Sequence, residues 1–240
     1  MNQALQIRSA LTAEQLPPPS QAWLQAFISQ QQQHLRPALP ALVATARAQL
    51  LAADLTMPGL LDAAAVAGCS FPAELAAPTA AMQQEMRLPR DVVVQVVDVE
   101  NLAQSRWQQV QELEAIERGE QKRGREIVRV VEENAGGTPA EDALPAAATP
   151  SAGPSATHRL VLQDGRGQTL FGLELTRIYR IGIGRMAMGE KLLLRSGTVV
   201  ARGVVLLEPP AVRFLGGRVE VMHKSWLEGR LGRLKDAART

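Results

Sequence analysis

The sequence predicts an α+β protein in which an N-terminal three-helix bundle precedes a small antiparallel β-barrel and a C-terminal helix. Two observations lead to this fold class. Apolar residues recur at helical spacing before Pro89, whereas short β-branched runs separated by Gly-containing turns dominate the region after it. The length of 240 residues, with 46% hydrophobic and 21% charged side chains, is sufficient for one or two domains with an apolar core.

Three short amphipathic helices are expected in residues 1–87. The first begins after Ser20, a candidate N-cap that follows three prolines. The second covers residues 39–55, and the third covers residues 60–67 and ends at Gly68. A bundle this small has little core of its own, so we expect it to dock on another surface.

The first strand of the barrel is expected at Val92–Val99, where β-branched residues are apolar on both faces, as in a central buried strand. Helical spacing returns over residues 100–117. Five later runs also predict strands, and three Gly-containing pairs supply turns. These runs are Arg159–Gln163, Gln168–Leu175, Lys191–Arg195, Val199–Leu207 and Ala211–Leu215.

A last amphipathic helix is expected after residue 220, and Trp107 and Trp226 are expected to anchor the core. The apolar face of this helix is expected to carry Val221, Met222, Trp226, Leu227, Leu231 and Leu234.

The segment between the valine strand and the next strand is unusually long. Residues 118–133 are charged but contain an apolar island at 127–131, and 20 of the 24 residues in 134–157 are Gly, Pro, Ala, Ser or Thr. Such a composition cannot bury enough apolar surface to offset the entropy lost on ordering. The segment is therefore either a linker between domains or a functional insertion. If the flanking strands pair, five or six short strands with this insertion fit an OB-type barrel.

The net charge of +2 conceals an asymmetry along the chain. Residues 1–157 contain 11 basic and 17 acidic side chains, whereas residues 158–240 contain 15 basic and 7 acidic ones. The basic part is suited to nucleic acid or to an acidic protein face, although a merely soluble basic surface stays open. Aromatic residues make up only 3%, which disfavours a surface that stacks many bases.

Motifs that carry catalytic chemistry are absent from the sequence. There is no P-loop, no Gly-x-Ser-x-Gly and no His or Cys pair at metal-ligand spacing, and the single cysteine excludes an internal disulfide. His34, His158 and His223 lie in different regions and are expected to be structural. Residues 182–187 match Gly-x-Gly-x-x-Ala, but the next strand leaves no room for the helix that dinucleotide binding needs. We therefore predict no enzyme, no catalytic residue, no cofactor and no metal. No apolar run reaches the roughly 18 residues that a membrane-spanning helix needs, and residues 1–15 lack the apolar core of a signal peptide.

Several segments resemble one known family. They are Leu88-Pro89 before the valine strand, Arg159–Gly165, Gly189–Leu194, Arg202–Pro209, Val212–Glu220, and Leu50–Leu55 in the helical region. The most specific signal is an apolar strand closed by Leu-Gly-Gly-x-Val at 215–219. Over about residues 15–235 the chain resembles the RecQ-mediated genome instability protein family, the OB-fold subunit of the RecQ helicase–topoisomerase III complex, in its short fungal-type form. The domains are then expected at 1–87 (helical bundle), 88–220 (OB-fold barrel, insertion about 118–157) and 221–240 (C-terminal helix and tail).

The resemblance implies a nuclear, non-catalytic accessory subunit that binds topoisomerase III and a RecQ-type helicase. Such a subunit promotes double Holliday junction dissolution and DNA decatenation by modulating the topoisomerase gate through its insertion. It would thereby act in homologous recombination, DNA repair and DNA replication, and contribute to genome stability. DNA binding is expected to be weak and driven by phosphates.

The resemblance also implies two sets of site residues. The topoisomerase interface would use Lys191, Leu51, Asp54 and Leu55. The gate insertion would use Arg118, Lys122, Arg123, Arg125, Ile127, Val128 and Arg129.

Blander interpretations of these residues remain open. Lys191 is also consistent with a lysine that protects a sheet edge, the leucines with packing inside the bundle, and the insertion with a solvated loop of mixed charge. At the level of the whole protein, the alternatives are a stand-alone OB-fold single-stranded DNA-binding protein and a scaffold for an RNA-linked topoisomerase. The first alternative needs aromatic residues on the sheet, where the barrel offers only Phe171, Tyr179 and Phe214.

Overall fold

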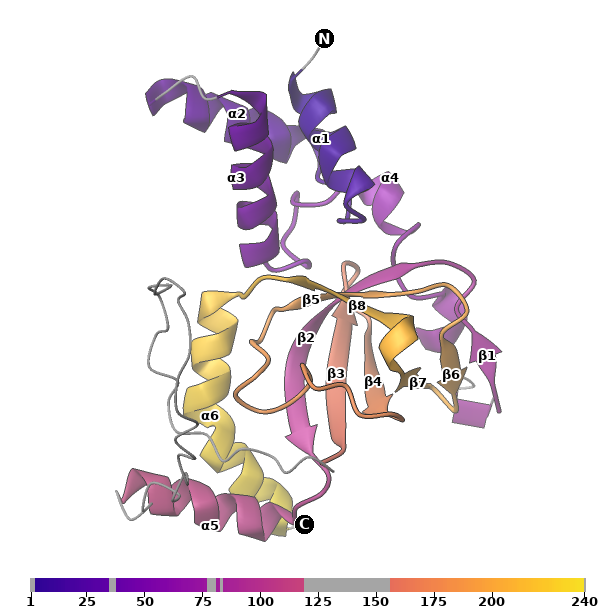
Figure 1. Ribbon diagram of the computed structural model, residues 1–240, viewed down its shortest axis with the longest axis vertical. Coiled ribbons are helices and arrows are strands. Elements are labelled where there is room, and N and C mark those ends of the chain that lie inside the picture. Colours follow the sequence, from indigo (N-terminus) through magenta and orange to yellow (C-terminus); the bar gives the residue numbers. More distant parts are fainter. Residues whose placement is uncertain (1–2, 35–37, 77–80, 83, 119–155, 240) are drawn as a thin grey trace, which may run out of the picture.

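The computed structural model describes residues 3–34, 38–76, 81–82, 84–118 and 156–239. Its helical domain lies at one end of a curled β-sheet, and a last helix runs along the side of that sheet (Figure 1). Buried apolar residues form two clusters, one inside the barrel and one inside the helical domain. The α+β fold class predicted from the sequence is confirmed.

The helical domain is built from three helices and a short fourth one. Their bounds are α1 (Gln3–Ala13), α2 (Gln21–His34), α3 (Leu39–Ala52) and α4 (Ala63–Val66), followed by the 3-10 turn η1 (Ala73–Ala76). Helix α1 was not expected, because only Ala4, Ile7 and Leu11 mark its buried face within a polar sequence. As expected, Ser20 caps α2: its hydroxyl accepts a hydrogen bond from the Trp23 amide at 3.0 Å.

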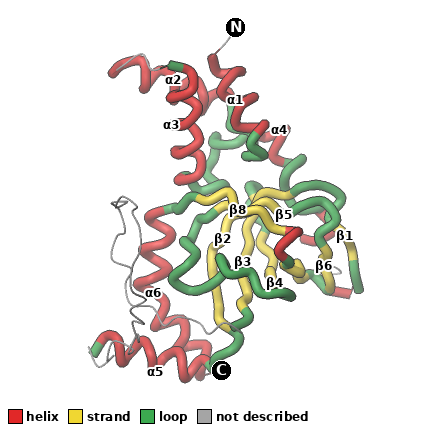
Figure 2. Tube along the Cα trace, viewed as in Figure 1, coloured by secondary structure: helices red, strands yellow, loops and turns green. Residues whose placement is uncertain are grey.

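The sheet contains eight strands in the order β1-β6-β7-β4-β3-β2-β5-β8. All neighbours are antiparallel except β4 and β7, which pair in parallel. Figure 2 shows the strands as a curled sheet below the helical domain. The bounds are β1 (Met86–Arg87), β2 (Val92–Asn101), β3 (His158–Asp164), β4 (Thr169–Glu174), β5 (Lys191–Leu194), β6 (Val199–Ala201), β7 (Val204–Leu207) and β8 (Val212–Gly216). The run expected as one strand at 199–207 is a hairpin instead, because Arg202 and Gly203 both have positive φ and form its turn.

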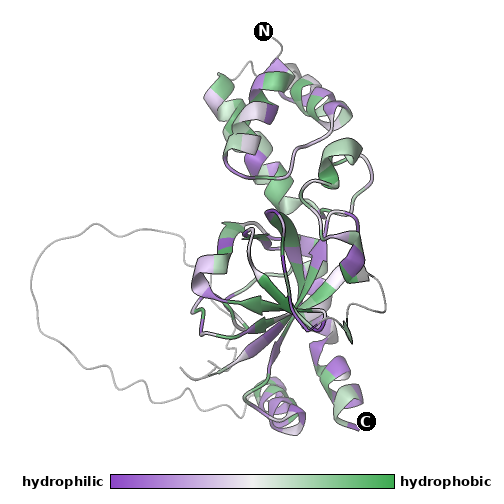
Figure 3. Ribbon diagram, turned by 90° about the vertical axis from the view of Figure 1, so that its right-hand side faces the viewer, coloured by the Kyte–Doolittle hydropathy of each residue, from purple (hydrophilic) through white to green (hydrophobic). Residues whose placement is uncertain are grey.

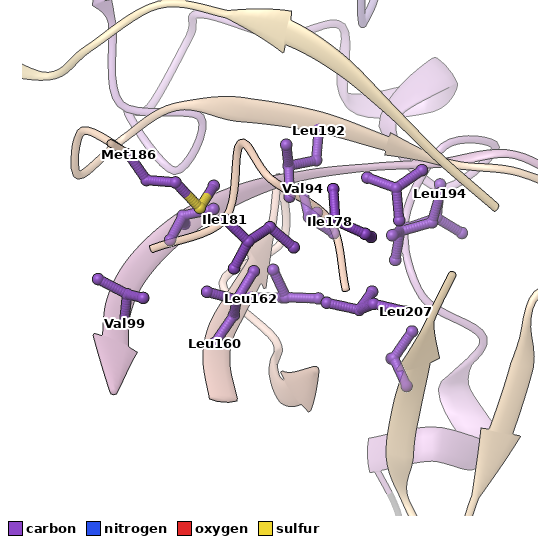
Figure 4. Packing of buried hydrophobic residues seen from close by; sticks show 14 of the residues in the cluster. Val94, Val99, Leu160, Leu162, Ile178, Ile181, Met186, Leu192, Leu194 and Leu207 are labelled. Carbon is purple, nitrogen blue, oxygen red and sulfur yellow. The ribbon is translucent and has the colours of Figure 1, made fainter. Parts of the chain in front are cut away.

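Strand β2 is central and buried, as expected, between β3 and β5. Its two apolar faces have different partners. Val92, Val94 and Val96 belong to the barrel core, which Figure 4 shows around Val94, whereas Val93 belongs to the cluster of the helical domain. A strand that is apolar on both faces therefore joins the two domains. Figure 3 shows hydrophobic residues concentrated in the barrel strands.

Two helices lie beside the barrel. Helix α5 (Arg106–Glu117) follows β2 and packs against α6 (Glu220–Arg239). Helix α6 runs along the side of the barrel, and α5 lies at the end away from the helical domain (Figure 1). Trp226 and Leu234 of α6 are buried as expected, but Val221 is 81% exposed and Arg230 takes an inner position one turn after Trp226. The expectation that Trp107 anchors the core is wrong: it lies on the outer side of α5 and is 58% exposed.

Candidate functional site at the junction of helical domain and barrel

Lys191 lies at the junction of the helical domain and the barrel. It is the first residue of β5 and has no exposed surface. Its ammonium donates hydrogen bonds to three carbonyl oxygens: Leu51 at 2.9 Å, Ala53 at 2.6 Å and Gly189 at 2.7 Å. All three N–H groups of the ammonium are therefore used inside the chain.

The position of Lys191 follows from the way α3 ends. The last carbonyls of a helix have no partner within it, and they carry the negative end of the helix dipole. The ammonium supplies both a donor and a positive charge at this end. Burial lowers the pKa of Lys191 to about 8, while the nearby carboxylate of Asp54 works in the opposite direction.

Asp54 and Gln95 form a second polar link across the junction. One carboxylate oxygen of Asp54 accepts from the Thr56 amide at 2.8 Å and from the side-chain amide of Gln95 at 2.7 Å. The carbonyl oxygen of the Gln95 side chain accepts from the Leu55 amide at 3.0 Å. Burial opposes ionisation of Asp54, but the hydrogen bonds from Gln95 and Thr56 outweigh it and lower the pKa of this carboxyl.

The apolar part of the junction surrounds these polar links. Leu51 and Leu55 are 6% and 2% exposed, and they belong to the same cluster as Val93, Leu193 and Leu215 of the barrel. Residues from three strands thus bury the end of α3 and the loop after it. The small bundle docks on the barrel of the same chain.

Two glycines explain physically why the Leu-Gly-Gly-x-Val signature lies here. Gly217 has φ +90°, and a Cβ atom at this position would stand 2.3 Å from the Leu51 carbonyl oxygen. Gly189 has φ +80°, and its Cβ would stand 2.4 Å from a methyl carbon of Val219. Only glycine allows both the backbone conformation and the close approach.

The structure thus brings the four residues of the expected topoisomerase interface to one place. Contact of Lys191, Leu51, Asp54 and Leu55 with topoisomerase stays a prediction. Because Lys191 and both leucines are buried, their direct role is to fix the helical domain on the barrel. The alternative that Lys191 protects a sheet edge is wrong, since β5 is paired on both sides. Sequence reasoning missed Gln95, whose polar side chain inside an apolar strand was the available signal.

The expected insertion lies between two paired strands. Strand β2 pairs with β3 from Asn101 and His158 onward, so residues 102–157 leave and return at the same end of one strand pair. The Leu102 amide donates to the Thr157 carbonyl at 2.9 Å and closes the base of this segment. The segment is therefore an insertion within the barrel, not a linker between domains.

Of the expected gate residues, the structure describes only Arg118. It caps the C-terminal end of α5, where its amide donates to the Glu114 carbonyl at 3.0 Å. The other gate residues lie outside the described residues: Lys122, Arg123, Arg125, Ile127, Val128 and Arg129.

The histidines with described side chains have structural partners. Nδ1 of buried His158 lies 2.7 Å from the Glu174 carboxylate, and Nδ1 of His223 accepts from the Met188 amide at 3.2 Å. Among the described residues, no group of three His, Cys, Asp or Glu side chains is placed to hold a metal ion. No helix in the described part of the chain combines the length and apolar character that crossing a membrane requires.

The fold and the junction define a class: OB-fold proteins with a helical N-terminal domain anchored on the barrel. Comparison with protein families gives the same domains. The model described as RMI1, N-terminal OB-fold domain, matches residues 71–230, and the one described as RMI1, N-terminal helical domain, matches residues 11–58. The chain belongs to the RMI1 family.

A similar protein is RecQ-mediated genome instability protein 1 of Schizosaccharomyces pombe. It is 29% identical over an alignment of 158 residues, which covers 62% of this chain and 65% of that protein. The chain thus spans about 65% of the length of this curated relative. The resemblance stated from the sequence is confirmed.

Proposed function

We propose that this chain is a non-catalytic subunit that binds topoisomerase III and a RecQ-type helicase in the nucleus. In this role it promotes double Holliday junction dissolution and DNA decatenation. The observation that carries the proposal is the insertion between β2 and β3 in a chain of the RMI1 family. A segment of this length between paired strands calls for a function.

The two parts of the proposal rest on different regions. The barrel, held to the helical domain by Lys191, provides a surface of fixed shape for docking on topoisomerase III. The insertion provides the element that acts on the gate. Its base is closed by the hydrogen bond between residues 102 and 157, at the end of the paired strands β2 and β3.

The decisive experiment separates docking from gating. One protein is the full chain, and the other carries a short Gly-Ser linker in place of residues 119–155, which leaves α5 and the base of the insertion intact. Both are tested for binding to topoisomerase III and for stimulation of decatenation. We expect both to bind and only the full chain to stimulate. If neither binds, the accessory-subunit proposal is wrong.

A second candidate function is supported by two aromatic side chains. Phe171 and Tyr179 are 45% and 72% exposed, and the guanidinium groups of Arg159 and Arg177 lie 4.6 and 5.8 Å from the respective ring centroids. Aromatic rings beside arginines suit single-stranded DNA. A protein that binds oligo-dT tightly but binds neither topoisomerase nor helicase would be a stand-alone DNA-binding barrel.

A further inference from the structure

A pocket of about 180 Å³ lies between the end of β2, the start of α5 and the second half of α6. Figure 1 places these elements at the end of the barrel far from the helical domain. Val99, Trp226, Leu234 and Ala237 contribute apolar surface. The charged lining comprises Arg106, Arg159, Arg230 and Arg233, against Asp98 and Glu100. The lining therefore has an excess of positive charge.

Arg230 is the unusual member of this lining. It is only 9% exposed, and its guanidinium carbon lies 5.6 Å from the ring centroid of Trp226. In the described part of the chain its N–H groups have no hydrogen-bond acceptor, whereas Arg233 donates to the Trp226 carbonyl at 2.7 Å and Arg106 to the Ala237 carbonyl at 3.0 Å. Burial lowers the pKa of Arg230, with Asp98 working against the shift. None of its nitrogens is among the fully enclosed polar atoms that lack a partner, so its unused donors stay accessible at the pocket and can take an acceptor that arrives from outside.

The carboxylates near the pocket already have partners. Asp98 accepts from the indole N–H of Trp226 at 2.6 Å and from the Val99 amide at 2.8 Å. Glu100 is paired with Arg159 and lies 3.5 Å from Arg106. Glu112, whose charge also reaches Arg230, accepts from the side chain of Gln104 at 3.0 Å. Among the described residues of this lining, the group left without a hydrogen-bond partner is thus a cation, Arg230.

We propose that this pocket binds the carboxylate side chain of an acidic residue in a partner protein, with Arg230 as the anchor. The arginine fork matches a carboxylate, and the apolar walls suit apolar residues flanking it. Asp98 and Glu100 in the lining, with the charge of Glu112 nearby, disfavour a run of nucleic-acid phosphates, whereas a single carboxylate can enter beside Arg230. The proposal goes beyond the topoisomerase role and does not depend on it.

The indole N–H of Trp226 reports directly on binding to the pocket, because Trp226 lines it. Since the chain has only three tryptophans, the indole signals are easily told apart. The full chain is titrated with N-acetyl-Leu-Glu-Leu-amide while the indole signals are followed by ¹H–¹⁵N NMR, with the Trp226 signal assigned from Trp226→Phe. We expect a saturable shift of this signal with a Kd on the order of 1 mM, since so small a ligand gains little on binding. The matched peptide with Gln in place of Glu should not produce it.

Two variants test the anchor. Arg230→Met should abolish the shift and change Tm little, because losing the attraction to Asp98 and the contact with the Trp226 ring is offset by no longer burying the guanidinium. Lys224→Gln removes an equal charge from an exposed position of α6 and should leave the titration unchanged. The proposal is overturned if neither peptide binds, if the Gln peptide binds equally well, or if oligo-dT shifts the Trp226 signal at lower concentration than the Glu peptide. If Arg230→Met does not fold, the comparison of the Glu and Gln peptides still tests the proposal on the unaltered protein.

Discussion

Replacing Lys191 with methionine removes the three hydrogen bonds that hold the end of α3 on the barrel. Methionine has a similar length but no donor, so the carbonyls of Leu51, Ala53 and Gly189 lose their partner. Each hydrogen bond to a charged group is worth about 1.5–3 kcal/mol, and the three together about 6 kcal/mol. The variant also avoids the free-energy cost of burying an ammonium group, which in the parent lowers the pKa of Lys191 from 10.5 to about 8. The avoided cost is about 3 kcal/mol.

The net loss expected for Lys191→Met is therefore about 3 kcal/mol, which corresponds to a fall in Tm of about 6–12 °C in a chain of this size. Circular dichroism during heating measures it, and urea unfolding checks the free energy. Lys224→Met is the matched control, because the Lys224 side chain is 74% exposed and its change should leave Tm within about 1 °C. If both variants unfold at the parental temperature, the junction does not depend on Lys191 and the reasoning fails.

The remaining predictions concern pH, glycine and salt. Because the pKa of Lys191 in the folded chain, about 8, lies below its ordinary 10.5, the unfolded chain binds more protons between these values. Between about pH 8 and 10.5 the free energy of unfolding of the parent should thus rise relative to that of Lys191→Met. If urea unfolding shows that the difference between the two proteins stays constant or falls over this range, the prediction is wrong. Gly217→Ala should lower the free energy of unfolding by about 2 kcal/mol or more, because its Cβ would meet the Leu51 carbonyl. Gly232→Ala, on the open face of α6, should be neutral or stabilising. Equal melting curves of the two variants would refute the close-approach argument. Binding of DNA by the full chain should weaken about tenfold between about 50 and 200 mM salt, measured by fluorescence anisotropy, and a salt-independent affinity would exclude phosphate contacts.

Features that depend on local pattern were predictable from the sequence. The β-branched run at 92–99 gave the central strand, and the capping role of Ser20 followed from its place before an apolar repeat. The hairpin at 199–207 was read as one strand because Arg202-Gly203 is a weak turn signal beside the apolar residues around it. The α6 face was misjudged since Arg230 occupies an inner position that periodicity assigns to apolar residues.

The junction was only partly predictable. The resemblance pointed to Lys191 and to the residues at the end of α3, but not to the contact between them. Lys191 and Leu51 are 140 positions apart, and no periodic pattern reports a pairing over such a separation. Gln95 shows the same difficulty, because its partners, Leu55 and Gln163, lie in other elements. Such contacts are determined by the packing of whole domains.

The hydrogen bond between Leu102 and Thr157 has a consequence for variation among related chains. The entropy cost of closing a loop grows with the logarithm of its length, so doubling the segment costs only about 0.6 kcal/mol. Changes in the number of residues between positions 119 and 155, which leave α5 and its packing on α6 in place, are therefore expected to cost the folding of the barrel little. Natural selection can then change the residues of this segment that contact a partner without changing the barrel core. The length of the segment can likewise adapt to partners of different sizes.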